Sequence, residues 1–458
     1  MKSLVFAGAF LALNFAVAGD PTVSGVTVQQ RWPWGQTVDI DFVLDGDDGE
    51  TYDVDVTLKD GDTPIASTRA DLEAFSGNVY GIGRGIHRLT FDPSKVAALN
   101  GQTFASVSAT VVPTRVALYK VFDLVDGTCE NVYGTELMAG LKGSCETNPV
   151  PGVESIVWTA VTNASGPYAD YATTKLLLRR INPGTFHMGT NVSQSSSVKY
   201  SGLPIVVTHS KPYYIGVFEV TQSQWTNVTQ GANPSEFTLH GERRPAEHMK
   251  FTDIRGTNAN WPTDGYGKAD SNSFLGKLCA KTQQTFDLPT YAQWKYAAMA
   301  GTETDYSDGI AGHPSQTSYN DRMAAIARYG GASGNAGINP ANVGAQGYPA
   351  AAECDTDKGT APVGSYRPNA WGLYDTTGNA WEAVQDWYAA PATQFVDLYH
   401  NKADPVGPTS GTRRWRIGGF WGQAANLLLS EWTGYDLNPT VAETAHRSTG
   451  FRVILMPY

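Results

Sequence analysis

The stretch that decides the fold is LYDTTGNAWE, residues 373–382. Its two carboxylates, Asp375 and Glu382, bracket a Gly378-Asn379 turn. Side-chain carboxylates and backbone carbonyls can converge at such a turn, and hard oxygen ligands of this kind suit calcium. A turn-forming or helix-capping role for Asp375 is the alternative, and the spacing alone leaves both interpretations open.

A second group of oxygen-bearing residues lies upstream of this stretch. It comprises Asn342, Val343, Asp355 and Asp357, which precede the segment 359–363. Aspartates of this spacing are either calcium ligands or solvated loop residues. On the residues alone, this group is a candidate for a second ion site.

Working outward, one clear helix precedes these groups. Leu288-Pro289-Thr290 leads into residues 291–300, where the Thr290 hydroxyl can accept from the first free amides and Trp294 shares one face with Ala297 and Ala298. Residues 272–281 are a plausible second helix. The remaining sequence after residue 175 consists of short apolar segments between long Gly-, Asn- and Pro-rich stretches, which predicts a loop-rich domain over residues 175–458.

The N-terminal part has a different pattern of apolar and polar residues. Val38, Ile40 and Phe42 alternate with polar residues, and the segment 52–58 repeats the pattern. Period-two alternation is typical of half-buried strands, so residues 20–113 are predicted to form an all-β, immunoglobulin-like sandwich. The acidic run 45–50 lacks the ligand order of an EF-hand, and a plain hairpin turn is favoured there. Residues 114–174 are predicted to be a connector.

The first residues indicate export. Lys2 supplies a positive charge, residues 4–15 form an apolar run, and Ala16-Val17-Ala18 is a small-residue cleavage site, so residues 1–18 are predicted to be a signal peptide. The run is too short to span a membrane. We therefore expect a secreted, periplasmic or cell-surface protein without a membrane span.

Charge and motif content exclude several function classes. The net charge of -11 and pI near 5.2 argue against a nucleic-acid partner, because phosphate neutralisation needs clustered Lys and Arg. The eight histidines are dispersed, with no His-x-x-x-His spacing. No Gly-x-Ser-x-Gly elbow, Walker motif or Rossmann motif occurs.

Four cysteines are present in a chain bound for an oxidising compartment: Cys129, Cys145, Cys279 and Cys354. Cys129 and Cys145 close the shortest loop and are the favoured disulfide pair. Cys279 and Cys354 could pair or remain as buried thiols, and the sequence leaves this open.

Several motifs occur in the order typical of one known family. They are INPGTFHMG at 181–189, YYIGVFEVT at 213–221, LPTYAQWKYAA at 288–298, NAWGLYD at 369–375 with GNAWE at 378–382, RIGGFW at 416–421 and GFRV at 450–453. Through these motifs, residues 176–457 resemble the formylglycine-generating enzyme, or sulfatase-modifying factor, family. The resemblance implies an α+β, irregular, loop-rich domain of C-type-lectin-like fold.

The resemblance also implies structural calcium. One ion is expected at the residues matching Asp375, Gly378, Ala380 and Glu382, where the glycine and the alanine bind through their carbonyls. The resemblance assigns a second ion to the upstream group at 342–343, Asp355 and Asp357.

The catalytic cysteines of the family are absent. Their positions fall at Gln423 and Leu428, and no cysteine follows Cys354. Soft thiolates bind Cu(I), whereas leucine has no donor and glutamine offers a hard amide, so no copper is expected. A sulfatase-modifying oxidase that converts a substrate cysteine to formylglycine by other means is the alternative.

Aromatic and charged residues surround the former cysteine positions. We expect a secreted, calcium-stabilised, non-catalytic recognition or adhesion module that uses this face to bind a glycan or a protein. The alternative is that the aromatic residues fill the core of the domain. The expected ligand-binding residues are Arg416, Trp421, Gln423, Glu431, Trp432 and Tyr435.

Overall fold

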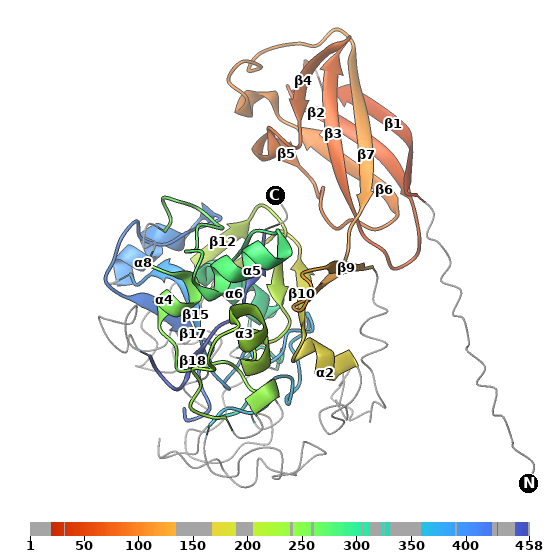
Figure 1. Cartoon of the computed structure of the whole chain (residues 1–458). Helices are drawn as coiled ribbons and strands as arrows, with labels where there is room; N and C mark the ends of the chain where they lie inside the picture. Colours follow the sequence, from red (N-terminus) through yellow and green to blue (C-terminus); the bar gives the residue numbers. More distant parts are fainter. Residues whose placement is uncertain are drawn as a thin grey trace, which may run out of the picture. The chain divides into compact units, whose positions relative to one another are not determined.

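The chain divides into two compact units, Met1–Val116 and Ala117–Tyr458 (Figure 1). A computed structural model describes residues 20–31, 33–133, 167–188, 205–238, 241–257, 261–304, 306–310, 323, 326–329, 359–389, 392–423, 428 and 445–456. The predicted signal peptide lies outside these residues. Within the described part, no helix is long and apolar enough to cross a membrane.

The first unit consists of two antiparallel sheets that share one hydrophobic cluster. Alternation places Val38, Ile40 and Phe42 in this cluster with the facing Val54 and Val56, which confirms the half-buried strands predicted from the sequence. The immunoglobulin-like assignment stays a prediction. One sheet has the order β1 (Thr22–Gln30), β2 (Val38–Asp45), β6 (Gly85–Phe91) and β5 (Phe75–Ser76), and the other has β4 (Thr63–Ser67), β3 (Tyr52–Asp60) and β7 (Val107–Arg115).

The hairpin predicted at residues 45–50 is wrong. Strands β2 and β3 on either side of it belong to different sheets, so the segment is a crossover. The Tyr52 hydroxyl accepts a hydrogen bond from the Asp47 amide at 2.9 Å. A polar turn sequence specifies a reversal of the chain but not the partner of the strand that follows.

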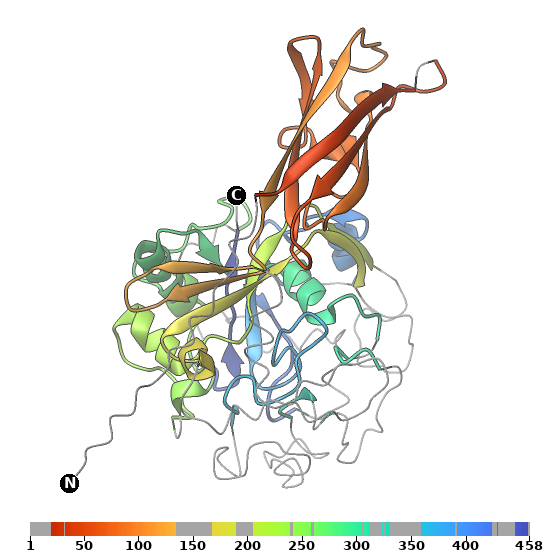
Figure 2. The ribbon, with the colours of Figure 1, turned by 90° about the vertical axis from the view of Figure 1, so that its right-hand side faces the viewer.

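The second unit is built on a six-stranded sheet. Its central strand β10 (Lys175–Ile181) pairs with β8 (Tyr119–Asp123) on one side and with β13 (Tyr213–Gly216) on the other. Figure 2 shows β8 and its neighbour beside β10, so residues assigned to a connector contribute strands to this sheet. The full order is β14 (Phe286–Asp287), β19 (Ile454–Leu455), β13, β10, β8 and β9 (Cys129–Val132).

Two smaller sheets complete the β structure of this unit. The sheet β17–β15–β18 carries the family motif, because β15 continues directly from the 373–382 stretch. All seven residues of β15 are buried. The strands of these sheets are β15 (Trp381–Trp387), β17 (Arg414–Ile417) and β18 (Thr449–Gly450), and β11 (Gly184–Met188), β12 (Ile205–His209) and β16 (Lys402–Ala403).

Among the described residues, the helices are short and fewer than the strands. The predicted Thr290 cap is confirmed at α6 (Tyr291–Met299), and α5 (Phe274–Thr282) confirms the second predicted helix to within two residues. All nine residues of α6 are buried, so it has no single apolar face. The other helices are α2 (Pro167–Tyr171), α3 (Gln222–Thr229), α4 (Phe251–Arg255) and α8 (Ala392–Tyr399), and 3-10 turns occur at Leu72–Ala74, Pro93–Lys95 and Gly241–Arg243.

The cysteine predictions are only partly covered by the described residues. Among the described residues neither Cys129, which is exposed, nor Cys279, which is half-buried, has a disulfide partner. The Cys279 sulfur lies 3.3 Å from the Phe286 amide. Cys145 and Cys354 lie outside the described residues. The Cys129–Cys145 disulfide therefore stays a prediction, and the pairing of Cys279 with Cys354 stays open.

A buried carboxylate cluster as candidate metal centre

The backbone of the 373–382 stretch turns sharply through left-handed conformations. Asp375, Gly378 and Asn379 have φ values of 55°, 78° and 60°. The Gly378 amide donates to the Gly418 carbonyl at 2.8 Å, and the Asn379 amide donates to the Arg328 carbonyl at 2.9 Å. A Cβ atom on Gly378 would lie 2.2 Å from the Arg328 carbonyl oxygen, so only glycine allows this approach. The turn is thus locked between two segments that are distant in sequence.

Asp375 has an unsatisfied carboxylate oxygen. Its side chain is buried, and Oδ2 accepts a hydrogen bond from the Gly364 amide at 2.6 Å. Oδ1 is buried and has no hydrogen-bond partner among the residues that the structure describes. Burial raises the pKa of Asp375 to about 7, because removal from water disfavours the charged form. A bound cation would compensate both the missing bond and the lost hydration.

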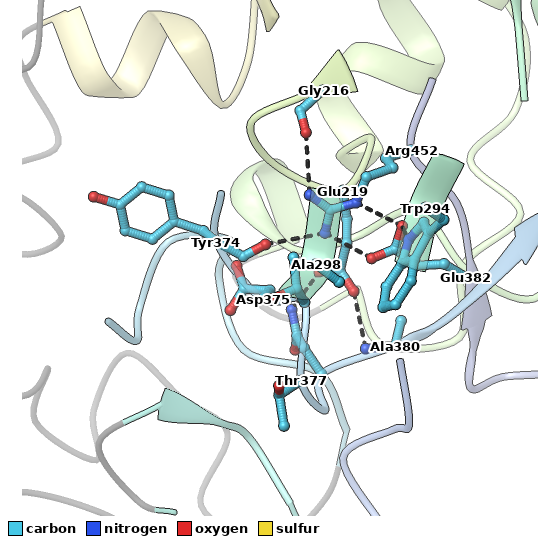
Figure 3. Close-up of polar contacts among 12 residues, drawn as sticks. Gly216, Glu219, Trp294, Ala298, Tyr374, Asp375, Thr377, Ala380, Glu382 and Arg452 are labelled. Carbon is cyan, nitrogen blue, oxygen red and sulfur yellow. Dashed lines mark hydrogen bonds and ion pairs between the residues drawn. The ribbon is translucent and has the colours of Figure 1, made fainter. Parts of the chain in front are cut away.

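Glu382 is held by an arginine, as Figure 3 shows. Arg452 donates from Nε to Oε2 and from Nη2 to Oε1, each at 2.6 Å, and both side chains are fully buried. The Trp294 indole donates to Oε2 at 2.7 Å. Arg452 also donates to the carbonyls of Tyr374 and Gly216. The Glu382 carboxylate is therefore firmly oriented by protein donors.

Sequence reasoning missed a third carboxylate, Glu219. It is completely buried and accepts hydrogen bonds from the Ala380 amide at 2.9 Å and from the Asn379 side chain at 2.5 Å. Burial raises its pKa well above the usual value, and the nearby Asp375 and Glu382 raise it further. Glu219 lies within the 213–221 motif, and Arg452 lies within the 450–453 motif. These two motifs are the sequence features that could have identified both residues.

The cluster therefore holds three buried carboxylates and the single Arg452 guanidinium. With every group ionised it would carry an excess of negative charge, which favours a divalent cation. Among the described residues, no three Asp, Glu, His or Cys side chains converge as a metal site, so an ion here would depend on backbone carbonyls as well. Asp375 could bind a calcium ion through Oδ1, whereas both carboxylate oxygens of Glu382 already accept hydrogen bonds from Arg452.

The second predicted ion site cannot be placed. Asn342, Val343, Asp355 and Asp357 all lie outside the described residues. That site stays a prediction.

The two positions of the family cysteines do come together. A Cβ atom on Gly419 would lie 2.1 Å from Leu428 Cδ2 and 3.3 Å from Gln423 Oε1, so both side chains converge over this glycine. Leu428 is buried in an apolar cluster with Trp381, and Phe420 packs against the same cluster. A leucine in an apolar environment offers no donor to a metal.

The three described residues of the expected ligand face are buried. Arg416, Trp421 and Gln423 are exposed by only 6%, 3% and 6%, and Trp421 packs edge-on against Phe237. Arg416 donates to the Thr449 hydroxyl at 2.6 Å, and burial lowers its pKa to about 10. These residues do not form an exposed surface, which favours the core-filling alternative for them. Glu431, Trp432 and Tyr435 lie outside the described residues.

Comparison with protein families gives a match over most of the chain. The profile of the "Sulfatase-modifying factor enzyme 1-like domain" matches residues 173–456. This range covers the 373–382 stretch, the three buried carboxylates and both former cysteine positions.

Characterised relatives are similar at low identity. "Chaperone protein LppX" of Paenibacillus barcinonensis is 28% identical over 246 residues, covering 49% of this chain and 75% of that protein. The "Formylglycine-generating enzyme" of Streptomyces coelicolor is 32% identical over 135 residues, covering 29% of this chain and 35% of the enzyme. The Mus musculus enzyme of the same name is 29% identical over 213 residues, covering 44% and 43%.

Two solved structures are also similar. "Treponema denticola variable protein 1" has a TM-score of 0.43 at 22% identity, covering 62% of this chain and 96% of that protein. PvdO from Pseudomonas aeruginosa has a TM-score of 0.44 at 20% identity, covering 61% and 94%.

Proposed function

The chain belongs to the Sulfatase-modifying factor enzyme 1-like domain family, and from this membership we propose that it is an exported, calcium-stabilised recognition module. In this proposal it has lost the copper-dependent oxidation of cysteine and binds a glycan or a protein. In the same proposal, the N-terminal unit is an immunoglobulin-like sandwich that precedes the recognition domain.

The observation that carries the proposal is the environment of the two former cysteine positions. Gln423 and Leu428 replace both thiolates, and Leu428 is packed among apolar side chains. An oxidase of this type needs soft sulfur ligands for Cu(I) and space for a substrate thiol. A buried leucine supplies neither.

A peptide assay separates this proposal from the oxidase alternative. The protein is incubated with a Cys-x-Pro-x-Arg peptide, oxygen and copper, and a formylglycine-generating enzyme is the positive control. We expect the peptide mass to remain unchanged by mass spectrometry while the control enzyme converts it. Conversion of the peptide cysteine by this protein would overturn the non-catalytic assignment.

Structural calcium is proposed at the 373–382 turn. Asp375 Oδ1 and the carbonyls of Gly378 and Ala380 would hold the ion, with Glu382 adjacent. When bound, the ion supplies positive charge that compensates the buried carboxylates. The unsatisfied Asp375 oxygen supports this assignment.

Chelation tests the calcium assignment. If the site is filled at about 100 times its dissociation constant, the ion contributes about 2.7 kcal/mol to the folded state. Adding EGTA should therefore lower the melting temperature, and excess calcium should restore it. The Asp375→Asn variant should respond less to calcium. Identical melting curves of the wild type with calcium and with EGTA would contradict the assignment.

A protein or glycan partner remains the proposed ligand class. The name of the Paenibacillus barcinonensis relative, a chaperone protein, agrees with a protein-binding role. Screening the intact protein on glycan and peptide arrays, with and without calcium, tests recognition directly. Absence of any saturable ligand would instead favour a purely structural surface protein.

A further inference from the structure

Three helices of the second unit enclose a groove that is separate from the carboxylate cluster. Its lining residues come from α3, α4, α5 and the loops next to them, and its volume is about 520 Å³. This volume falls in the range of about 300 to 1,000 Å³ typical of small-ligand sites. The groove is lined by none of the predicted calcium ligands and by neither former cysteine position.

The floor of the groove is aromatic and rigid. Trp225 of α3 and Phe274 of α5 lie in the lining, and their rings stack at 5.2 Å with an interplanar angle of 13°. The Trp225 indole donates to the Ala232 carbonyl at 3.3 Å, which fixes the loop at the edge of the groove. The two side chains are exposed by only 6% and 2%, so a ligand would meet the preformed edges of these rings.

One wall is fixed by Asp270. Its Oδ2 accepts hydrogen bonds from the Thr257 amide at 2.7 Å and from the Thr257 hydroxyl at 2.8 Å. Cβ atoms on Gly256 and Gly276 would lie 2.4 Å from the Asp270 side chain and 2.0 Å from its carbonyl oxygen. Asp270 is thus packed closely against two glycines. Because its position is fixed, this wall is already formed before a ligand binds.

The lining of the groove includes both hydrogen-bond donors and acceptors. Asn272 is exposed, and its amide makes no hydrogen bond with the described residues. Lys277 uses one of its three donors on the Thr229 carbonyl at 3.0 Å. Asp253 is exposed and accepts from the Lys250 amide through Oδ2 at 2.9 Å.

A groove that offers both donors and acceptors favours a ligand whose groups can both donate and accept hydrogen bonds. An ammonium group only donates and a phosphate mostly accepts, whereas a hydroxyl does both. Adjacent hydroxyls of a sugar can pair with the Asn272 amide, the Lys277 ammonium and the Asp253 carboxylate. The C–H groups of the sugar can then contact the exposed edges of Trp225 and Phe274. We propose that this groove binds a neutral mono- or disaccharide. The inference rests on the proposed recognition role but concerns a different surface.

Saturation-transfer NMR on the intact protein tests the proposal. The probes are glucose, galactose, mannose, N-acetylglucosamine and their common disaccharides, with glycylglycine as a zwitterionic comparison. We expect saturable transfer to at least one sugar and none to the dipeptide. Asn272→Ala should weaken sugar binding about tenfold, as expected for the loss of a hydrogen bond in the site. Ala232→Trp should abolish binding by filling the groove from its exposed edge.

Ser271→Ala is the matched control, because Ser271 is exposed next to Asn272 but does not line the groove. It should bind sugar like the wild type. Absence of sugar binding, binding that survives Ala232→Trp, or preference for the dipeptide would each overturn the proposal. The peptide oxidation assay is independent of the groove, so failure here leaves the non-catalytic assignment standing.

Discussion

At the scale of single residues, three left-handed backbone positions lie beside the buried carboxylate cluster. Asp375, Gly378 and Asn379 adopt left-handed conformations within reach of the Glu219 and Glu382 carboxylates. Glu382 is paired with Arg452, whereas Asp375 keeps one buried oxygen without a hydrogen-bond partner among the described residues. Such residues tolerate little change, because neither the backbone nor the charges can relax into water.

The first prediction concerns Gly378. Gly378→Ala and Gly301→Ala impose the same left-handed strain, since φ is 78° and 80° at the two positions. Only at Gly378 does the new Cβ collide with a neighbour, the Arg328 carbonyl, whereas nothing lies within 4 Å at Gly301. We expect Gly301→Ala to cost about 1 to 2 kcal/mol and Gly378→Ala several kcal/mol more in urea unfolding. Equal losses would show that the Arg328 segment moves freely.

The second prediction concerns the pH dependence of stability through Glu247. Its side chain is buried, Oε1 accepts from the Phe237 amide at 3.0 Å, and Oε2 has no partner. Burial raises its pKa from 4.5 to about 7. The folded state therefore binds this proton more tightly than the unfolded state does. The stability that this provides is fully present below about pH 4.5 and is lost as the pH rises through about 7.

Glu247→Gln should remove this dependence, because the amide stays neutral and its oxygen still accepts from Phe237. Between pH 5 and pH 8 the free energy of unfolding of the wild type should fall relative to that of the variant by roughly 2 to 3 kcal/mol. Chemical denaturation at each pH measures this difference. Parallel profiles for the two proteins would contradict the buried, proton-binding role of Glu247.

At the scale of elements, short helices are stabilised by side-chain caps, and α6 also by burial on all sides. Both α3 and α6 begin with capping boxes, Thr221 with Gln224 and Thr290 with Gln293. The sequence identifies such caps because they are local. It does not identify the burial of all nine α6 residues, since that depends on the sheets around the helix.

The third prediction isolates the α6 cap. The Thr290 hydroxyl accepts from the Gln293 amide at 3.1 Å, and the Gln293 side chain accepts from the Thr290 amide at 2.9 Å. Thr290→Ser and Thr290→Ala both lose the buried methyl group, and only the alanine variant also loses the hydroxyl. We expect the alanine variant to be about 1 kcal/mol less stable than the serine variant in urea unfolding. Equal stability would mean that the cap contributes nothing.

At the scale of the whole molecule, the chain is two units with separate cores. The first unit closes its own hydrophobic cluster around Val38, Phe42 and Val56, and the carboxylate cluster lies entirely in the second. Each unit should therefore unfold with its own cooperativity, and an ion bound to one should leave the other unchanged.

The fourth prediction follows from this division. Differential scanning calorimetry of the intact protein should resolve two transitions, and EGTA should lower the temperature of only one. A fragment of residues 20–116 should reproduce the transition that EGTA does not move. A single transition, or two that both shift on chelation, would show that the units are energetically coupled.

The sequence by itself determined the features that depend on neighbouring residues. The alternation in 38–42 specified strands, the Thr290 cap specified the start of α6, and the 373–382 stretch identified the family. These signals are local, because a strand period or a helix cap is complete within a few residues.

Only the tertiary structure decided what surrounds the 373–382 turn. It brought Glu219 within hydrogen-bonding distance of Asn379, 160 positions away, and paired Glu382 with Arg452, 70 positions away. It also placed Gln423 and Leu428 together in the interior and formed the groove between three helices. Such contacts depend on how distant segments pack, and no local pattern in one sequence encodes that packing.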